Sequence, residues 1–105
     1  MTTALNGLKI LDFSTLLPGP FATMYLADMG AEVIHIESPT RPDLVRIMPP
    51  YANGQATSHS YLNRNKQSIA LDLKDPASIE LIKSRISEFD IVVEQFRPSV
   101  MQRLG

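Results

Sequence analysis

The sequence predicts an α/β fold, with a parallel sheet and flanking helices, and three observations lead to it. Short apolar runs alternate with helix-like segments in the order strand, helix, strand, loop, strand, helix, strand. The run "IVVEQF" (91–96) is almost continuously apolar, as in strands that a parallel sheet buries on both faces. Glycine and proline stand between the runs, where the chain is expected to turn.

The first half of the chain predicts a strand–helix–strand unit. "LKILDF" (8–13) is the first strand, and the Pro-Gly-Pro turn at 18–20 then allows a helix to begin at about Phe21. Because only two residues between 21 and 29 are polar, we expect this helix to be buried on most sides. Gly30 ends it, and "EVIHIE" (32–37) is the second strand.

Residues 38–67 show no hydrophobic period. The segment contains four prolines and the pair Asn53-Gly54, which favour turns. We therefore expect one long loop without regular elements, of a length that is uncommon unless the loop binds or covers something.

The second half repeats the alternation. "SIALDL" (68–73) is a strand with apolar residues at every second position, and Asp75 is the expected N-cap of a helix that extends to about Glu88. "IVVEQF" is the next strand, and "PSVMQRLG" begins another helix. One side of the helix that Asp75 caps carries Ile79, Ile82 and Ile86.

Composition limits the possible functions. The 105 residues, 44% of them hydrophobic, suffice for one core. With 10 Lys and Arg against 11 Asp and Glu, the net charge of −1 provides no cationic field for nucleic acid or an anionic membrane, so we expect neither as a partner. Without cysteine there is no disulfide and no thiolate metal site. The start "MTTALNGLK" lacks the features of a secretion signal, and we expect a cytoplasmic protein.

Residues 11–38 resemble the opening of a nucleotide-binding βαβ unit, but their turn "STLLPGPF" (14–21) lacks the glycine fingerprint. It has one glycine between two prolines, and proline has no N–H to donate to a pyrophosphate. Glu37 stands 37 − 19 = 18 residues after Gly19, near the position of a ribose-binding acid. The missing donors nevertheless disfavour classical dinucleotide binding.

Three segments carry a resemblance to a known family. "LNGLKILDFSTLLPGPFATMYLADMGAEVIHIESP", "YLNRNKQSIALDLKDP" and "DIVVEQFRPSVMQRLG" resemble, in this order, the N-terminal part of the family III CoA-transferases of the CaiB/BaiF type. The resemblance implies that coenzyme A (CoA), as the carrier moiety of an acyl-CoA substrate, occupies the crevice of the Rossmann-like sheet without a further cofactor. It also implies that residues 1–105 are an incomplete part of a larger domain whose full-length chains interlock as a homodimer.

The resemblance leaves three functions open. The first is transfer of CoA between an acyl-CoA thioester and a carboxylic acid, in which the family uses an aspartate nucleophile. The second is α-methylacyl-CoA racemisation, because "LPGPFATMYLAD" is similar to racemase members, and the third is a truncated CoA-binding or assembly module without turnover. In both enzyme types the catalytic residues follow the matched segment, so we expect no catalytic residue in this chain.

The resemblance also implies which residues contact CoA. They stand where the predicted strands end, which is where open α/β sheets bind ligands, and they bring cations and an aromatic ring to an adenine that bears phosphates. Ser38 departs from the family, which often has an arginine there; Arg41 or Arg46 is a possible substitute. The implied contact residues are Leu16, Leu17, Leu71, Asp72, Leu73, Lys74, Gln95, Phe96, Arg97 and Arg103.

Three of these residues, and two acids elsewhere in the chain, also have a plain structural interpretation. Lys74 and Arg103 are typical of solvated surface charges, and Phe96 of a core residue. Two strand-end acids, Asp12 and Glu37, are interpreted either as an acid/base pair or as groups that cap a turn and fix a loop.

The two histidines, His35 and His59, have no second ligand at metal-binding spacing. We expect no metal site.

Overall fold

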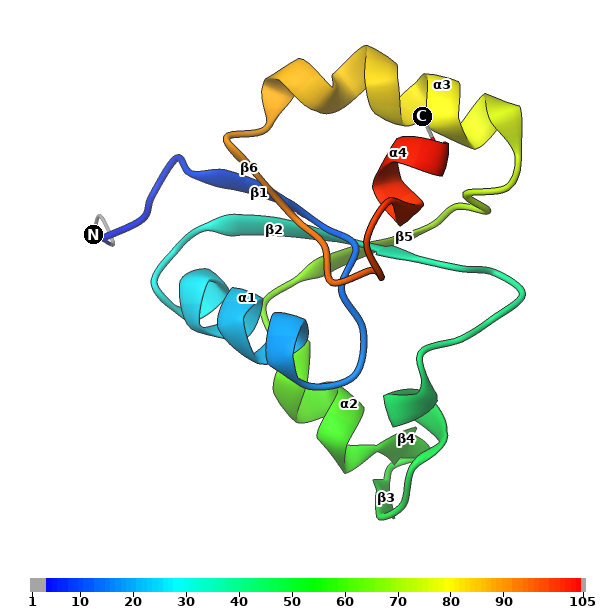
Figure 1. Cartoon of the computed structure of the whole chain (residues 1–105). Helices are drawn as coiled ribbons and strands as arrows, with labels where there is room; N and C mark the ends of the chain where they lie inside the picture. Colours follow the sequence, from blue (N-terminus) through cyan, green and yellow to red (C-terminus); the bar gives the residue numbers. More distant parts are fainter. Residues whose placement is uncertain (1–3, 105) are drawn as a thin grey trace.

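The computed structural model describes residues 4–104. Along the chain, most helical segments connect one strand of the main sheet to the next (Figure 1). The strands are β1 (Lys9–Asp12), β2 (Glu32–Glu37), β3 (Tyr51–Ala52), β4 (Gln55–Ala56), β5 (Gln67–Ala70) and β6 (Ile91–Val93). The α-helices are α1 (Pro18–Asp28), α2 (Thr57–Leu62), α3 (Pro76–Arg85) and α4 (Val100–Leu104), and the 3₁₀ helices are η1 (Leu44–Ile47) and η2 (Ile86–Glu88).

Four parallel strands form the main sheet in the order β5-β2-β1-β6, which confirms the predicted fold class. In β1, Ile10 lies opposite Val33 of β2 and Ile91 of β6. The chain moves from β1 outwards to β2 and β5, and then crosses to the other side of β1 to form β6. The strand order therefore reverses between β1 and β6, as in doubly wound nucleotide-binding folds.

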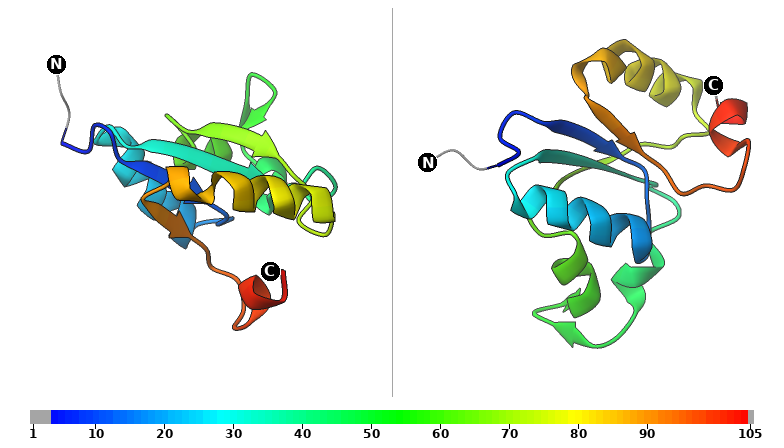
Figure 2. Two further views of the ribbon diagram at one scale, coloured as in Figure 1. Left: turned by 90° about the horizontal axis from the view of Figure 1, so that it is seen from above. Right: turned by 60° about the vertical axis from the view of Figure 1, so that its left-hand side comes forward.

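Helices cover both faces of this sheet (Figures 1 and 2). On one face Ile10 and Val33 pack against Ala27 of α1. On the other face Leu11 of β1 belongs to an apolar cluster that includes Ile82 of α3. Successive residues of β1 thus face opposite helices, as the period of a strand requires.

Helix α1 is less buried than the sequence predicts. Pro18 occupies its first turn, where the missing N–H costs nothing, and Gly30 follows its end with φ = +103°. The expectation of burial on most sides is wrong, because Phe21, Tyr25 and Met29 are exposed. These residues are four apart, so they share one outward stripe of the helix.

Residues 38–67 leave the sheet and return to it at β5, but they are not without regular structure. The segment contains η1, the hairpin β3–β4 and α2. Asn53 and Gly54 form the two-residue hairpin turn, both with positive φ (53° and 78°). An Asn-Gly pair is the strongest local hairpin signal, so the sequence did contain the indication that corrects the expectation.

The second crossover agrees with the sequence. Asp75 caps α3, since its carboxylate accepts a hydrogen bond from the backbone N–H of Ala77 at 3.0 Å. The helical conformation continues through η2 to Glu88. An apolar hollow of about 310 Å³ lies beneath the helix and is lined by Phe13, Leu73, Ile79, Ile82, Lys83, Ile86, Val92 and Met101.

The two predictions of strands buried on both faces have different outcomes. Burial is confirmed for β1, in which Ile10, Leu11 and Asp12 are buried. For β6 the expectation is wrong, because Ile91 and Val92 are 40% and 41% exposed. In the described part of the chain β6 is an edge strand, with β1 as its one neighbour in the sheet.

We predict that the 105-residue chain associates in solution. An edge strand with exposed apolar side chains offers unpaired backbone groups to a second copy. Size-exclusion chromatography with light scattering is expected to show a mass that rises with concentration, and Ile91→Lys should shift it towards the monomer. Leu81→Lys, an exposed apolar residue of α3 away from this edge, is the matched control and should leave the association unchanged. A parent chain that is monomeric at all concentrations and unfolds cooperatively would contradict this prediction.

Candidate functional site

The carboxyl ends of β1, β5 and β6 lie at the same edge of the sheet, because all three strands run parallel (Figure 2). The segments that leave this edge are 13–17, 71–74 and 94–97. The crevice at which the strand order reverses lies between the first and the third of them. In open α/β sheets this is where ligands bind.

Gln95 crosses this crevice from the end of β6 to the turn between β1 and α1. Its Oε1 accepts a hydrogen bond from the Gly19 N–H at 3.0 Å, and its Nε2 donates to the carbonyl oxygen of Thr15. A Cβ at residue 19 would overlap with the side chain of Ser14 and lie 2.8 Å from Oε1 of Gln95. The single glycine of the turn therefore serves packing within the chain.

The first turn of α1 has no free N–H group to offer an anion. Pro18 and Pro20 have none, and the Gly19 N–H is bound by Gln95. The next donor, the Phe21 N–H, is bound to the Leu17 carbonyl at 2.9 Å. A pyrophosphate held by a helix N-terminus needs such donors, so the geometry excludes the usual dinucleotide arrangement at this turn.

Beneath the turn lies a buried polar cluster centred on Asp12, which is fully buried. Its Oδ1 accepts from the Ser14 N–H at 2.8 Å and from the Ser14 hydroxyl, and its Oδ2 accepts from Thr23 Oγ1 at 2.7 Å. Asp12 therefore caps the turn. It is not the free half of an acid/base pair.

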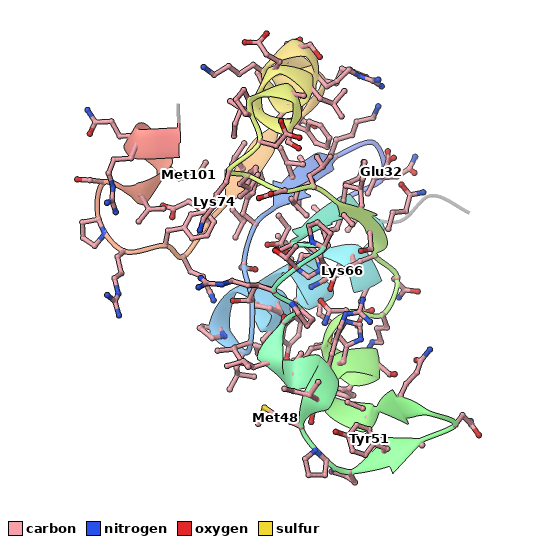
Figure 3. All side chains as sticks on the ribbon, turned by 90° about the vertical axis from the view of Figure 1, so that its right-hand side faces the viewer. Glu32, Met48, Tyr51, Lys66, Lys74 and Met101 are labelled. Atoms are coloured by element: carbon pink, nitrogen blue, oxygen red, sulfur yellow. The ribbon has the colours of Figure 1, made fainter. Side chains whose placement is uncertain are left out.

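Lys66 completes this cluster, and no motif in the sequence points to it. Its side chain is 1% exposed and places Nζ 3.7 Å from Oδ2 of Asp12 (Figure 3). Nζ also donates to the Pro20 carbonyl at 3.1 Å and to Oδ1 of Asn63 at 3.0 Å. Burial lowers the pKa of Lys66, and the nearby carboxylate of Asp12 opposes that shift. In the sequence this lysine looks like any surface lysine.

The carboxylate of Glu37, at the end of β2, accepts hydrogen bonds from other side chains of the same chain. Arg46 donates two hydrogen bonds of 2.8 Å to its carboxylate, and Ser68 of β5 donates a third. Hydrogen bonding to Arg46 lowers the pKa of Glu37 from 4.5 to about 2. Glu37 thus holds the loop that follows it, which confirms the structural interpretation, and its carboxylate is not free to bind a ribose.

Leu16 and Leu17, the first of the implied CoA contacts, are 38% and 59% exposed on the β1–α1 turn. Leu16 has a positive φ of 64°, and its N–H lies 3.2 Å from both carboxylate oxygens of Asp43. Leu17 lines a hollow of about 510 Å³ with Phe21 of α1 and Tyr61 of α2.

A second group of implied contacts gathers around Phe13. The ring of Phe96 lies 6.3 Å from that of Phe13, and Leu71 and Leu73 pack against the same cluster. Lys74 and Arg103 line one hollow of about 420 Å³ beside Leu73. The structure thus brings an aromatic ring and two cations to one edge of the sheet, although they are up to 29 residues apart (103 − 74).

Two of the residues expected to contact CoA, Asp72 and Arg97, have side chains that belong neither to the group at the β1–α1 turn nor to the group around Phe13. The carboxylate of Asp72 accepts from the Lys74 N–H at 3.0 Å and so shapes its own turn. Arg97 is exposed, and its carbonyl accepts from the Val100 N–H at the start of α4.

Ser38 likewise shapes a turn, because its hydroxyl accepts from the Arg41 N–H at 3.0 Å. The charge of Arg46 is paired with Glu37. Of the two proposed substitutes for the family's arginine, only the exposed Arg41 remains.

Within residues 4–104, no three His, Asp or Glu side chains are placed to hold a metal ion. No helix in that range has the length and hydropathy needed to cross a bilayer.

Comparison with known proteins identifies the family. Residues 5–105 match CoA-transferase family III. The chain belongs to this family. Human succinyl-CoA:glutarate CoA-transferase is 43% identical over 96% of this chain and 23% of its own length. Formyl-CoA:oxalate CoA-transferase of Afipia carboxidovorans is 41% identical over the whole chain and 25% of its own length.

Solved structures of the family share the fold. A CaiB/BaiF family protein from Brucella suis superimposes with a TM-score of 0.89 at 32% identity, over 99% of this chain and 29% of that one. The hypothetical protein Rv3272 of Mycobacterium tuberculosis gives 0.88 at 35% identity, over 98% and 28%. The predicted resemblance is confirmed, and the chain spans about a quarter of the length of its relatives.

We predict that Glu37 makes the stability of this family member depend on acid pH. Its folded-state pKa of about 2 lies below the ordinary value of 4.5, so its stabilising contribution is complete above 4.5 and is lost as the pH falls towards 2. Thermal unfolding between pH 2.5 and 6 should show a weaker pH dependence for Glu37→Gln than for the parent. Glu88→Gln is the control: Arg85 also lowers the pKa of Glu88, but that carboxylate is exposed and solvent screens it. Identical slopes for the parent and Glu37→Gln would contradict the role assigned to Glu37.

Proposed function

We propose that this chain forms the CoA-binding part of an enzyme that transfers CoA from an acyl-CoA thioester to a carboxylic acid. The observation that carries the proposal is the gathering of Phe96, Lys74 and Arg103 at the carboxyl edge of the sheet. CoA presents an adenine ring, a 3′-phosphate and a diphosphate, which an aromatic and apolar surface bordered by cations can bind.

The β1–α1 turn provides a second argument for CoA as the ligand. Because the first turn of α1 has no free donor, the phosphates of CoA must be bound elsewhere, and the hollow between Lys74 and Arg103 provides the charge. The exposed side chains of Leu16 and Leu17 offer apolar contacts, which suit the uncharged pantetheine arm. The site therefore favours CoA over NAD.

The names of the relatives support transfer as the reaction. Succinyl-CoA:glutarate, acetyl-CoA:oxalate and formyl-CoA:oxalate CoA-transferases are all similar to this chain, and each name pairs an acyl-CoA with a dicarboxylic acid. We extend this to the chain's own enzyme and propose a dicarboxylic acid as the acceptor. We also propose that the full-length protein acts as a homodimer.

The catalytic groups of this enzyme are proposed to lie outside the 105 residues. Ser14, Asp12 and His35 do lie together, which suggests a catalytic triad, but their bonds are wrong for one. The Ser14 hydroxyl donates directly to Asp12, and Nε2 of His35 donates to the Ser14 carbonyl at 2.8 Å. All three residues are at most 1% exposed, so no substrate reaches them. They support the turn and do not form an activated nucleophile.

We therefore predict that the purified chain alone does not transfer CoA. Incubation with succinyl-CoA or formyl-CoA and with glutarate or oxalate is expected to give no new thioester by mass spectrometry. A preparation of a full-length family member serves as the positive control. Turnover by the chain, free of any full-length contaminant, would show that a nucleophile is present within it.

The binding site itself is tested by comparing ligands. Equilibrium dialysis with labelled CoA, dephospho-CoA and NAD measures binding whether or not the chain associates. We expect CoA to bind most tightly, and Lys74→Ala or Arg103→Ala to weaken CoA binding about ten- to a hundredfold, since a charge-assisted contact contributes roughly 1.5–3 kcal/mol.

The matched control for these variants is Arg85→Ala. It removes an exposed cation at the other end of α3, where Arg85 pairs with Glu88, and it should leave CoA binding unchanged. Equal binding of NAD and CoA, or alanine variants that bind CoA like the parent, would mean that Lys74 and Arg103 are solvated surface charges.

A further inference from the structure

We infer that Asp43 is a positioning residue that holds the β1–α1 turn in the conformation that contacts CoA. The inference rests on the proposed function, because it concerns the turn that presents Leu16 and Leu17. Asp43 does not touch the ligand in this arrangement. It acts through the backbone of Leu16.

The geometry around Asp43 is that of a clamp. The side chain is buried, with 5% of the residue exposed, and both of its carboxylate oxygens lie 3.2 Å from the Leu16 N–H. Oδ1 also accepts from the Val45 N–H at 3.1 Å, which caps η1. One carboxylate therefore ties the loop after β2 to the turn after β1, across 27 residues of sequence.

Leu16 needs such a clamp because its backbone conformation is unfavourable. A φ of +64° is in the left-handed region, which a residue with a Cβ rarely adopts unless its surroundings impose it. Hydrogen bonding of the Leu16 N–H to a buried carboxylate is a strong constraint of this kind. Strained residues held in this way are typical of ligand-binding sites.

The remainder of the turn is fixed from other directions. Gln95 binds Thr15 and Gly19 on either side of Leu16, and His35 binds the Ser14 carbonyl. Without Asp43 the cap of η1 is lost, and within the turn only Leu16 is released to return to negative φ, which changes the directions of its own side chain and that of Leu17. The loss should therefore affect CoA binding more than it affects the fold.

A double-mutant comparison tests this mechanism. Asp43→Ala is expected to weaken CoA binding about tenfold, and Asp43→Asn less, since the amide keeps one acceptor oxygen. Glycine adopts positive φ without strain, so Leu16→Gly removes the need for the clamp even though it loses a contact of its own. In the Leu16→Gly background, Asp43→Ala should therefore weaken CoA binding by less than about threefold.

The measurements are the dissociation constant for labelled CoA by equilibrium dialysis and the thermal midpoint, both on the 105-residue chain. Asp28→Ala is the matched control. Asp28 also ties α1 to the end of the 38–67 segment, by hydrogen bonds from Arg64 and Asn65, but it lies away from the turn. Its replacement should lower the thermal midpoint without a selective loss of CoA binding.

The outcomes separate this inference from the proposed function. A parent chain that binds no CoA overturns the proposed function. A parent that binds CoA, with a folded Asp43→Ala variant of equal affinity, overturns only the role of Asp43. Equal losses in the parent and in the Leu16→Gly background also overturn it, because Asp43 would then act through general stability. If Asp43→Ala does not fold, the comparison of Asp43→Asn in the two backgrounds decides the question in the same way.

Discussion

The buried carboxylate of Asp12 is the group on which the rest of the structure depends. It binds the turn after its own strand through Ser14, the helix that follows through Thr23, and the end of the 38–67 segment through Lys66. A charge removed from water is costly unless it is paired and hydrogen-bonded, and Asp12 satisfies both conditions only when these three segments meet. The need to pair the buried charge of Asp12 thus determines how the β1–α1 turn, α1 and the end of the 38–67 segment are held together.

The binding edge follows from this constraint. Asp12 and His35 hold the β1–α1 turn from within the chain. Gln95 accepts a hydrogen bond from the Gly19 N–H of this turn, and Asp43 accepts one from the Leu16 N–H. A fold whose helix N-terminus usually binds a pyrophosphate here has that position filled by its own side chains. In the proposed function, phosphate recognition therefore depends on cations from other strand ends, which is the basis of the proposed preference for CoA.

The apolar surfaces of the chain have to be considered together with its family. Phe21 and Tyr25 on α1, and Ile91 and Val92 on β6, are exposed in a protein whose solved relatives are more than three times as long, since it covers 28% or 29% of them. The first βαβ unit is nevertheless well packed around Ile10 and Val33. The region under α3 is looser, and apolar hollows remain beneath that helix.

The sequence by itself determined the elements whose signals are local. The parallel sheet could be predicted because β1 and β2 are short apolar runs separated by a turn and a glycine-ended helix, and α3 because Asp75 and Pro76 mark its start. The segments at the edge of the sheet are the predicted CoA site, from strand ends and from the family resemblance, and that assignment stays a prediction. The hairpin at Asn53 and Gly54 had a local signal too, although the prolines around it favoured a loop.

Only the tertiary structure decided what depends on contacts between distant residues. No period or motif indicates that Lys66 is buried against Asp12. Nor does any indicate that Gln95 accepts a hydrogen bond from the Gly19 N–H, or that Asp43 holds Leu16 at positive φ. The exposure of β6 could not be predicted for the same reason. An apolar run indicates that a strand can be buried, but not whether neighbouring segments are present to bury it. Side-chain burial and hydrogen-bond partners are properties of the assembled chain, because each arises only where segments far apart in sequence meet.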